Sequence, residues 1–359
     1  MKKIKFICSI LFFAIVVSGC TKIEGIDQDL SFLSTVGFTN PSKVFDISND
    51  NSGNVKITPL GNGATSYTVN LGHGTGAAAS AVVAPGFSVT HLYPEGTYTV
   101  SIAATDNAGV ITTNTYELKV TYRAPENLKV KIESNIVVSA EALYTKSFEV
   151  SFGDTAGKVY PLALGAKLPA HTYPAGGPYE LKVVALSGGA AKTTFVKTLS
   201  GLPLTFDNSA VKDSIAVTGT GQAFEKVANP FSTGLNTSSM VGKFTRGTEG
   251  NSSAKFMFDV PVNFAQGNQI KLWVYNTDAA YIGKKMNVEF ESVVGVLPAT
   301  ALTIAKATVL KSGEWEELIF DFSANTATAP KFQTIVFRFS TLQVIPGAII
   351  YIDNVRLTN

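Results

Sequence analysis

Short runs in which apolar and polar residues alternate fill most of this chain, and clusters of Gly, Pro, Asn and Asp separate them. Alternation with a period of two places every second side chain on the same face of an extended strand. Such runs, bounded by turn residues, are typical of β-sandwiches. The pattern therefore predicts an all-β chain, and clear examples are residues 67–71, 98–102, 116–120, 148–152 and 179–183.

Residues 39–122 and residues 123–201 repeat one another. Four residues of the first stretch recur 80 positions later: His91, Tyr93, Pro94 and Gly96 match His171, Tyr173, Pro174 and Gly176. Residues 69–74 recur in the same way as residues 150–155. This period is too long for a solenoid repeat and suits small tandem domains. We therefore expect one β-sandwich domain in each stretch.

The repeated motifs resemble PKD domains, which carry a Gly-Asp-Gly turn and, later, a His-x-Tyr-x-x-x-Gly-x-Tyr run ahead of the next strand. The first copy matches through His91, Tyr93, Gly96 and Tyr98. It departs at His73, where the family has Asp, whereas the second copy keeps Asp154 but loses the Gly that follows. The resemblance implies two Ig-like sandwiches that act as spacers.

All three histidines of the chain lie in these motifs. His91 and His171 occupy equivalent places, which favours a hydrogen-bonded, structural role for both. A zinc site would need further His or Cys ligands, and the stretch from residue 21 onward has no cysteine. The sequence therefore predicts neither disulfides nor a thiolate metal site in the folded part.

The last part of the chain, residues 202–359, has longer runs and more phenylalanine. No stretch of it shows a sustained 3.6-residue period with capping residues, so we expect no helices of ordinary length. About ten strands of this kind predict a single jelly-roll sandwich. The expected order is thus two Ig-like sandwiches followed by a jelly roll.

Framework residues of this last part resemble the C-terminal carbohydrate-binding jelly rolls of Bacteroidota surface glycan-binding lipoproteins and secreted glycanases. They are residues 202–207, 228–230, 234–238, 315–318 and 351–355. The resemblance implies a jelly roll that binds polysaccharide, with β-glucan as one candidate. It also implies a polysaccharide-uptake system, in which the partners are an outer-membrane importer and its glycan-binding lipoproteins. It does not identify the glycan.

A sugar site needs flat aromatic faces for the C–H side of a pyranose ring and a few polar groups for its hydroxyls. Alternation places Trp273 and Tyr275 on the strand face opposite Ile270, Leu272 and Val274. The predicted ligand-binding residues are Trp273, Tyr275, Tyr281, Glu289, Trp315 and Arg338. Trp315 has an alternative interpretation as a framework residue packed under a loop. Whether the faces that carry these residues belong to one sheet stays open.

Catalysis is not expected. Hydrolysis of a glycosidic bond needs two carboxylates at a set spacing, and the acids are densest at Glu314, Glu316 and Glu317. Glu316 and Glu317 are neighbours on one strand, so they point to opposite faces and cannot pair. Two other functions remain as alternatives: a surface adhesin or structural lipoprotein that binds protein, and an accessory subunit of a glycoside hydrolase.

Binding of this kind requires no cofactor, but related jelly rolls often hold one structural calcium. Their calcium ligands are oxygens from the first and last strands. Asp207 and Asp353 lie at the matching places in this sequence. The resemblance therefore implies a calcium ion at these two aspartates, and the alternative is that both are turn or edge residues.

The N-terminal residues have the layout of a lipoprotein signal. Lys2, Lys3 and Lys5 precede an apolar run, which ends in a small-residue segment before Cys20. This ending resembles a bacterial lipobox, which implies a signal at 1–19, acylation of Cys20 and a tether over 20–38. Cleavage leaves 26 of the 29 basic residues against 27 acidic ones, so nucleic acid is not an expected partner. The expected location is the outer membrane, with the body facing the cell exterior.

Overall fold

A computed structural model describes residues 44–133, 135–174, 176–292, 301–324, 332–340 and 344–359. These residues form antiparallel strands and short 3-10 helices, which confirms the predicted all-β class. The signal segment, Cys20 and the tether lie outside the described residues. Within the described part, no helix has the length and apolar character needed to cross a membrane. The chain divides into two compact units between Thr121 and Tyr122.

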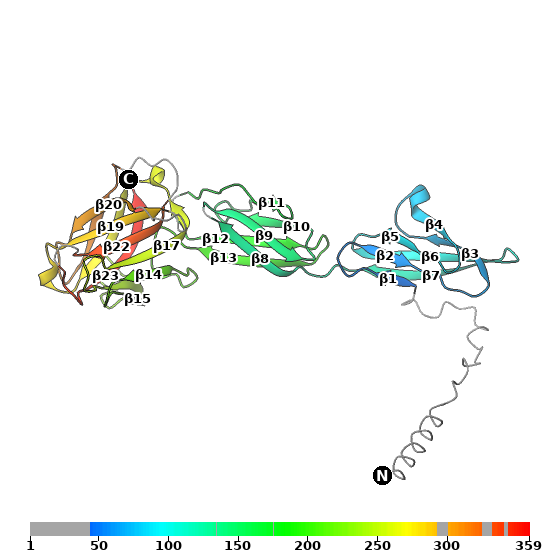
Figure 1. The fold of residues 1–359 in the computed structure, drawn as a ribbon, viewed down its shortest axis with the longest axis horizontal. Coiled ribbons are helices and arrows are strands. Elements are labelled where there is room, and N and C mark those ends of the chain that lie inside the picture. The colour runs from blue at the N-terminus through cyan, green and yellow to red at the C-terminus, as the bar shows by residue number, and fades with distance from the viewer. Residues whose placement is uncertain (1–43, 134, 175, 293–300, 325–331, 341–343) are drawn as a thin grey trace, which may run out of the picture. The chain divides into compact units, whose positions relative to one another are not determined.

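The first unit is a β-sandwich of a three-stranded sheet, β1-β2-β5, and a four-stranded sheet, β4-β3-β6-β7 (Figure 1). Alternate residues of its strands, such as Val55, Val69 and Val100, are buried between the sheets. The elements are β1 (Phe45–Ile47), β2 (Asn54–Ile57), β3 (Ala64–Asn70), η2 (Gly76–Ala79), β4 (Ser80–Val83), β5 (Val89–Leu92), β6 (Gly96–Asp106) and β7 (Ile111–Val120).

The His-Tyr motif of this unit joins β5 to the turn after β3. Tyr93 is buried, and its hydroxyl donates a hydrogen bond to the carbonyl of Leu71 over 2.8 Å. The next residue, Gly72, has a φ of +65°. The Nδ1 atom of His73 lies 2.9 Å from Nε2 of His91, at hydrogen-bond distance. His91 is therefore hydrogen-bonded as predicted, and its partner is His73, which matches Asp154 of the second copy.

The first unit should become less stable as the pH falls, because of His91. Burial first, and then the charge of His73, lower the pKa of His91 below its ordinary 6.5. The unfolded chain then binds the proton more readily, so protonation favours unfolding as the pH drops below the ordinary value. We expect the first unit to melt at a lower temperature at about pH 5.5 than at about pH 7.5. Melts followed over this range should show a weaker dependence in a His91→Gln variant; an equal dependence would contradict the assignment.

The second unit begins with another sandwich, which pairs the sheet β11-β10-β12-β13 with the hairpin β8-β9. It repeats the motif of the first unit, since the Tyr173 hydroxyl donates to the carbonyl of Phe152 over 3.0 Å. Nε2 of His171 lies 2.8 Å from a carboxylate oxygen of Asp154. The strands are β8 (Glu126–Glu133), β9 (Val137–Leu143), β10 (Ser147–Ser151), β11 (Tyr160–Leu162), β12 (Tyr179–Leu186) and β13 (Lys192–Leu199).

The jelly roll follows in the same unit and consists of two five-stranded sheets, β14-β17-β22-β19-β20 and β15-β16-β23-β18-β21. We call these the β19 sheet and the β18 sheet. Their elements are β14 (Ser214–Thr218), β15 (Ala223–Ala228), β16 (Met240–Thr245), β17 (Ser253–Val262), η3 (Phe264–Gln266), β18 (Gln269–Asn276), η4 (Ala279–Tyr281), β19 (Lys285–Ser292), β20 (Ala301–Thr308), β21 (Trp315–Asp321), β22 (Phe332–Phe339) and β23 (Ile349–Thr358).

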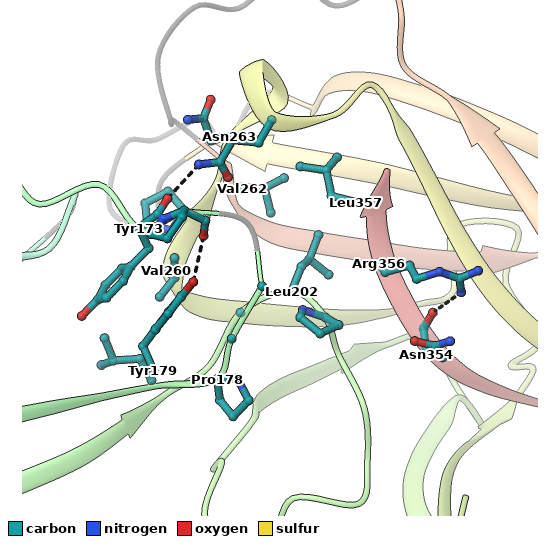
Figure 2. A pocket seen from close by; sticks show the side chains of 18 residues that line it. Tyr173, Pro178, Tyr179, Leu202, Val260, Val262, Asn263, Asn354, Arg356 and Leu357 are labelled. Atoms are coloured by element: carbon teal, nitrogen blue, oxygen red, sulfur yellow. Dashed lines mark hydrogen bonds between the residues drawn. The ribbon is translucent and has the colours of Figure 1, made fainter. Parts of the chain in front are cut away.

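The second sandwich is docked on the jelly roll through polar contacts and a small apolar surface. The carboxylate of Asp259, in β17, accepts a hydrogen bond from Nζ of Lys197 over 2.6 Å and another from the backbone N–H of Ser200 over 3.0 Å. The side-chain amide of Gln266 donates to the carbonyl of Tyr173 over 2.8 Å. Val260 packs against the core of the sandwich. A pocket remains beside these contacts (Figure 2).

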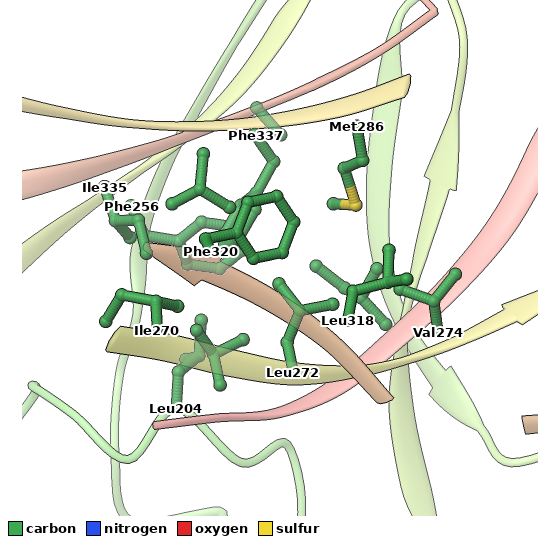
Figure 3. Packing of buried hydrophobic residues seen from close by; sticks show 14 of the residues in the cluster. Leu204, Phe256, Ile270, Leu272, Val274, Met286, Leu318, Phe320, Ile335 and Phe337 are labelled. Atoms are coloured by element: carbon green, nitrogen blue, oxygen red, sulfur yellow. The ribbon is translucent and has the colours of Figure 1, made fainter. Parts of the chain in front are cut away.

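The core of the jelly roll lies between its two sheets. Figure 3 shows Ile270, Leu272 and Val274 of β18 facing residues of the β19 sheet, among them Met286 and Phe337. Burial of each such side chain stabilises the fold by about 1.5–3 kcal/mol. Because these three residues of β18 face the core, its alternate residues must point to the outer face of the β18 sheet.

Candidate glycan-binding face

The outer face of the β18 sheet carries a row of aromatic side chains. Tyr351 of β23 is the cross-strand neighbour of Tyr275 of β18, and Tyr275 is the neighbour of Trp315 of β21. Trp273 lies two residues before Tyr275 on the same side of β18. Phe231, from the connection between β15 and β16, completes the group. We call Phe231, Trp273, Tyr275, Trp315 and Tyr351 the aromatic face.

The connection over residues 229–239 covers part of this face. The ring of Phe231 stacks on Tyr275, with centroids 3.9 Å apart and an interplanar angle of 5°. The indole N–H of Trp315 donates to the carbonyl of Phe231 over 2.8 Å. Tyr275 and Trp315 are consequently only 7% and 5% exposed. The prediction that both contact ligand is corrected: they support the face from below, because the loop closes over them.

Trp315 should therefore matter for the loop and not for direct ligand contact. A Trp315→Phe variant keeps an aromatic ring but leaves the carbonyl of Phe231 without its donor. Such a loss costs about 1–3 kcal/mol for a buried acceptor. We expect a lower melting temperature and faster proteolysis within residues 229–239. Unchanged cleavage in that segment would show that Trp315 does not hold the loop.

Trp273 keeps part of its surface in solvent. The Arg356 guanidinium carbon lies 5.7 Å from the centre of the indole, and Arg356 also forms an ion pair with Glu317. The indole N–H of Trp273 is buried and has no hydrogen-bond partner within the described chain. Phe231 and Tyr351 are also partly exposed. Three aromatic rings, two on the sheet and one on the loop above it, thus remain partly accessible, and rings of this kind can stack on the C–H side of a sugar.

Glu289 and Arg338 do not join Trp273. They belong to β19 and β22 of the other sheet, where Nε of Arg338 lies 2.9 Å from a carboxylate oxygen of Glu289. Glu289 is 5% exposed. Since the two sheets turn their inner faces to each other, their outer faces lie on opposite sides of the sandwich. The prediction that these residues assist Trp273 is therefore wrong, because alternation within a strand does not tell which sheet it joins.

Tyr281 is also separate from the aromatic face. It ends the short helix η4, whose first turn is capped by Asp278. Its ring packs edge to face on Phe339, with centroids 5.9 Å apart, and it borders the jelly-roll core. Tyr281 therefore has a packing role in this structure, and it is not placed to share a ligand with Trp273.

Asp207 and Asp353 both hold the end of the covering loop. Asp207 accepts the backbone N–H groups of Ser239 and Met240 over 3.0 and 2.8 Å. Asp353 accepts from the Asn236 amide over 2.9 Å and from the Ser238 hydroxyl over 2.6 Å. Burial raises the pKa of Asp353.

The described residues contain no group of three or more His, Cys, Asp or Glu side chains that could hold a metal. Asp207 and Asp353 bind the same short segment of the chain. Their oxygens already accept hydrogen bonds from the chain, however, so calcium at this place stays a prediction.

The acids considered for catalysis are held apart. Glu316 is buried and accepts the backbone N–H groups of Leu310 and Lys311 over 3.0 and 3.1 Å. Glu317 points to the outer face, where it pairs with Arg356. The two carboxylates thus lie on opposite faces of β21, as alternation predicts, and they do not form a catalytic pair.

Tyr351 and Phe231 of the aromatic face, and Arg356 beside it, were not among the predicted ligand-binding residues. Tyr351 could have been found, because it alternates with Ile350 and Ile352 in the last strand. Phe231 lies outside any strand, so no periodic signal marks it. Only the folded chain brings Phe231 onto Tyr275.

No protein-family model and no curated protein matches the chain. Among solved structures, carbohydrate-binding modules of the β-sandwich superfamily share 14% identity, with a TM-score of 0.27, over 88% of this chain and 97% of theirs. A module specific for non-crystalline cellulose shares 12%, with a TM-score of 0.32, over 45% and 97%. A cleaved adhesin domain of Lys-gingipain from Porphyromonas gingivalis shares 19%, with a TM-score of 0.31, over 44% and 96%. At these scores the similarities support no conclusion about what this chain binds.

Proposed function

We propose that this chain binds a neutral polysaccharide through the aromatic face of its jelly roll. The observation that carries the proposal is the set of partly exposed rings, Phe231, Trp273 and Tyr351, on an outer sheet face. The core of the jelly roll uses only the inner face of this sheet, so exposed aromatic rings on its outer face indicate a binding surface. Buried Tyr275 and Trp315 brace these rings, so the surface is rigid before ligand arrives.

Two ion pairs lie on the outer face of the β18 sheet. Lys243 pairs with Glu225 across two neighbouring strands, with the charged atoms 3.1 Å apart. Arg356 of β23 pairs with Glu317 of β21 across the intervening strand β18, next to Trp273. These two pairs offer donors and acceptors to hydroxyl groups, and Lys271, two residues before Trp273 on the same side of β18, adds a further donor.

Affinity gel electrophoresis tests this function directly. The native protein should be retarded in gels that contain a neutral polysaccharide, with β-glucans tried first, and should migrate normally with an acidic polysaccharide such as alginate. Bovine serum albumin serves as the control for non-specific retardation. Normal migration in every neutral polysaccharide would reject the function and would favour the alternative of an adhesin that binds protein.

The protein is proposed to act without catalysis, as a binding lipoprotein on the cell surface. Glu316 is hydrogen-bonded to the backbone and Glu317 is paired with Arg356, which supports the proposed absence of catalysis. The lipobox-like ending before Cys20 supports the proposed place on the cell surface, and an outer-membrane importer and its lipoprotein partners are the proposed context. Two or more acyl chains on Cys20 would give stable anchoring, whereas one chain binds a membrane only weakly.

Anchoring has its own test. A Cys20→Ala variant should lose lipidation and move from the membrane fraction to the soluble fraction, whereas a Cys8→Ala variant should stay with the membrane. Fractionation followed by immunoblotting gives the result. A Cys20→Ala protein that still sediments with membranes would disprove the lipoprotein interpretation.

A further inference from the structure

The second sandwich and the jelly roll enclose a pocket of about 270 Å³. Figure 2 shows Tyr179 and Pro178 of the sandwich on one side and Val262 and Leu357 of the jelly roll on another. Its walls are mostly apolar, and Asn263, Gln266, Asn354 and Arg356 are the polar residues among those that line it. Apolar walls with a few amides and one cation are the usual composition of a site for a small ligand or for part of a larger one.

The wall on the sandwich side is stiff. The rings of Tyr173 and Tyr179 stack with centroids 4.4 Å apart and an interplanar angle of 13°. The hydroxyl of Tyr179 donates to the carbonyl of Pro174 over 3.2 Å, and Gln266 ties Tyr173 to the jelly roll. Tyr179 therefore offers an aromatic surface in a set position, which is what a sugar ring requires from its partner.

Arg356 connects the pocket with the aromatic face. It lines the pocket, and its guanidinium lies over the ring of Trp273 and pairs with Glu317. Its neighbour Asn354 lines the same pocket, and the Asn354 carbonyl accepts from Nη1 of Arg356 over 3.2 Å. A ligand that lies on Trp273 and continues past Arg356 would reach the pocket. Only an extended chain can do this.

The chemistry of the pocket fits the same neutral chain. No carboxylate is among the lining residues, and the one cation, Arg356, is already balanced by Glu317. The side-chain amides of Asn263, Gln266 and Asn354 can donate to and accept from hydroxyl groups. An anionic group would find no unpaired cation among the residues that line the pocket.

We propose that this pocket is a second subsite for the polysaccharide, which runs from Trp273 past Arg356 and places a neutral sugar unit against Tyr179. The inference rests on the proposed function. It assigns the second sandwich a part in ligand binding, in place of the spacer role that the sequence resemblance implies. It also makes the affinity depend on chain length, because short oligosaccharides reach only the aromatic face.

Two variants alter the pocket without touching Trp273. Gly177 lines it with a backbone outside the left-handed region, and a Cβ there would meet the Tyr179 ring at an ordinary 3.6 Å. Gly177→Leu should therefore fill the pocket. Asn354 has a φ of +49°, which glycine adopts without strain, so Asn354→Gly removes the amide and keeps the backbone. Thr172→Leu, an exposed site on the same segment outside the pocket, is the matched control.

Calorimetric titrations use a short and a long oligosaccharide cut from a neutral polysaccharide that retards the native protein. Native protein and Thr172→Leu should bind the long one more tightly. Gly177→Leu and Asn354→Gly should bind it about tenfold more weakly than the native protein does, and the short one equally well. If both variants keep the native preference for the long oligosaccharide, the subsite is disproved, while weaker binding in Trp273→Ala still supports the proposed function. If the native protein binds no neutral polysaccharide, both proposals fail.

Discussion

Replacing Trp273 with alanine should weaken polysaccharide binding by about 2–3 kcal/mol, which is roughly 30- to 150-fold in Kd. Trp273 is the partly exposed ring of the aromatic face that Arg356 flanks, and it lies on the path to the pocket. Stacking of an aromatic ring contributes about 0.5–1.5 kcal/mol beyond the area that it buries. Removal of the indole takes away both contributions together.

The loss must be separated from damage to the fold. Trp273 packs against the buried part of the aromatic face, so its removal should also lower the melting temperature slightly. Trp273→Phe keeps a ring and should retain much of the affinity. Ile319→Ala is a matched control, since Ile319 is 49% exposed on the neighbouring strand β21. Titration calorimetry beside thermal melts decides the matter: native affinity in Trp273→Ala would exclude this face as the site.

The second large effect concerns stability. Gly153→Ala should lower the free energy of unfolding of the second unit by about 2–4 kcal/mol. A Cβ at Gly153 would lie well inside 3.0 Å of the carbonyl oxygen of Glu180, so the backbone of β12 would have to move. The φ of +79° adds strain for any residue with a Cβ.

The repeat supplies a replicate of this experiment, and a nearby turn supplies its control. In the first unit, a Cβ at Gly72 would meet the carbonyl oxygen of Thr99 in the same way, so Gly72→Ala should be equally damaging. Gly157 has a similar φ of +71° but nothing within 4 Å of its Cβ position, so Gly157→Ala measures the backbone strain alone. In urea unfolding experiments, Gly153→Ala should have a clearly lower free energy of unfolding than Gly157→Ala. Equal losses would mean that strain, and not the close strand, makes the glycine necessary.

The motif that recurs in the two sandwiches could be predicted from the sequence. The glycine of each copy follows β3 or β10, and the tyrosine precedes β6 or β12, so the common spacing of the motif is enough to predict that the copies share a structure. The hydroxyls of Tyr93 and Tyr173 donate hydrogen bonds to the carbonyls of Leu71 and Phe152, which are the residues before the two glycines. The partner of each histidine also follows from the motif, because His73 and Asp154 occupy the same position in it.

Strand alternation by itself determined the all-β class and the side of the strand on which each aromatic residue lies, because a side chain's direction in a strand depends only on its position along the chain. Trp273, Tyr275 and Trp315 all lie on an outer face, as that rule requires. Only the tertiary structure decided which strands share a sheet, and it placed Glu289 and Arg338 on the opposite side from Trp273. It also decided which outer residues stay exposed, since a loop without periodic signal brings Phe231 over Tyr275 and Trp315. Burial depends on what packs from elsewhere in the chain, and no local pattern carries that information.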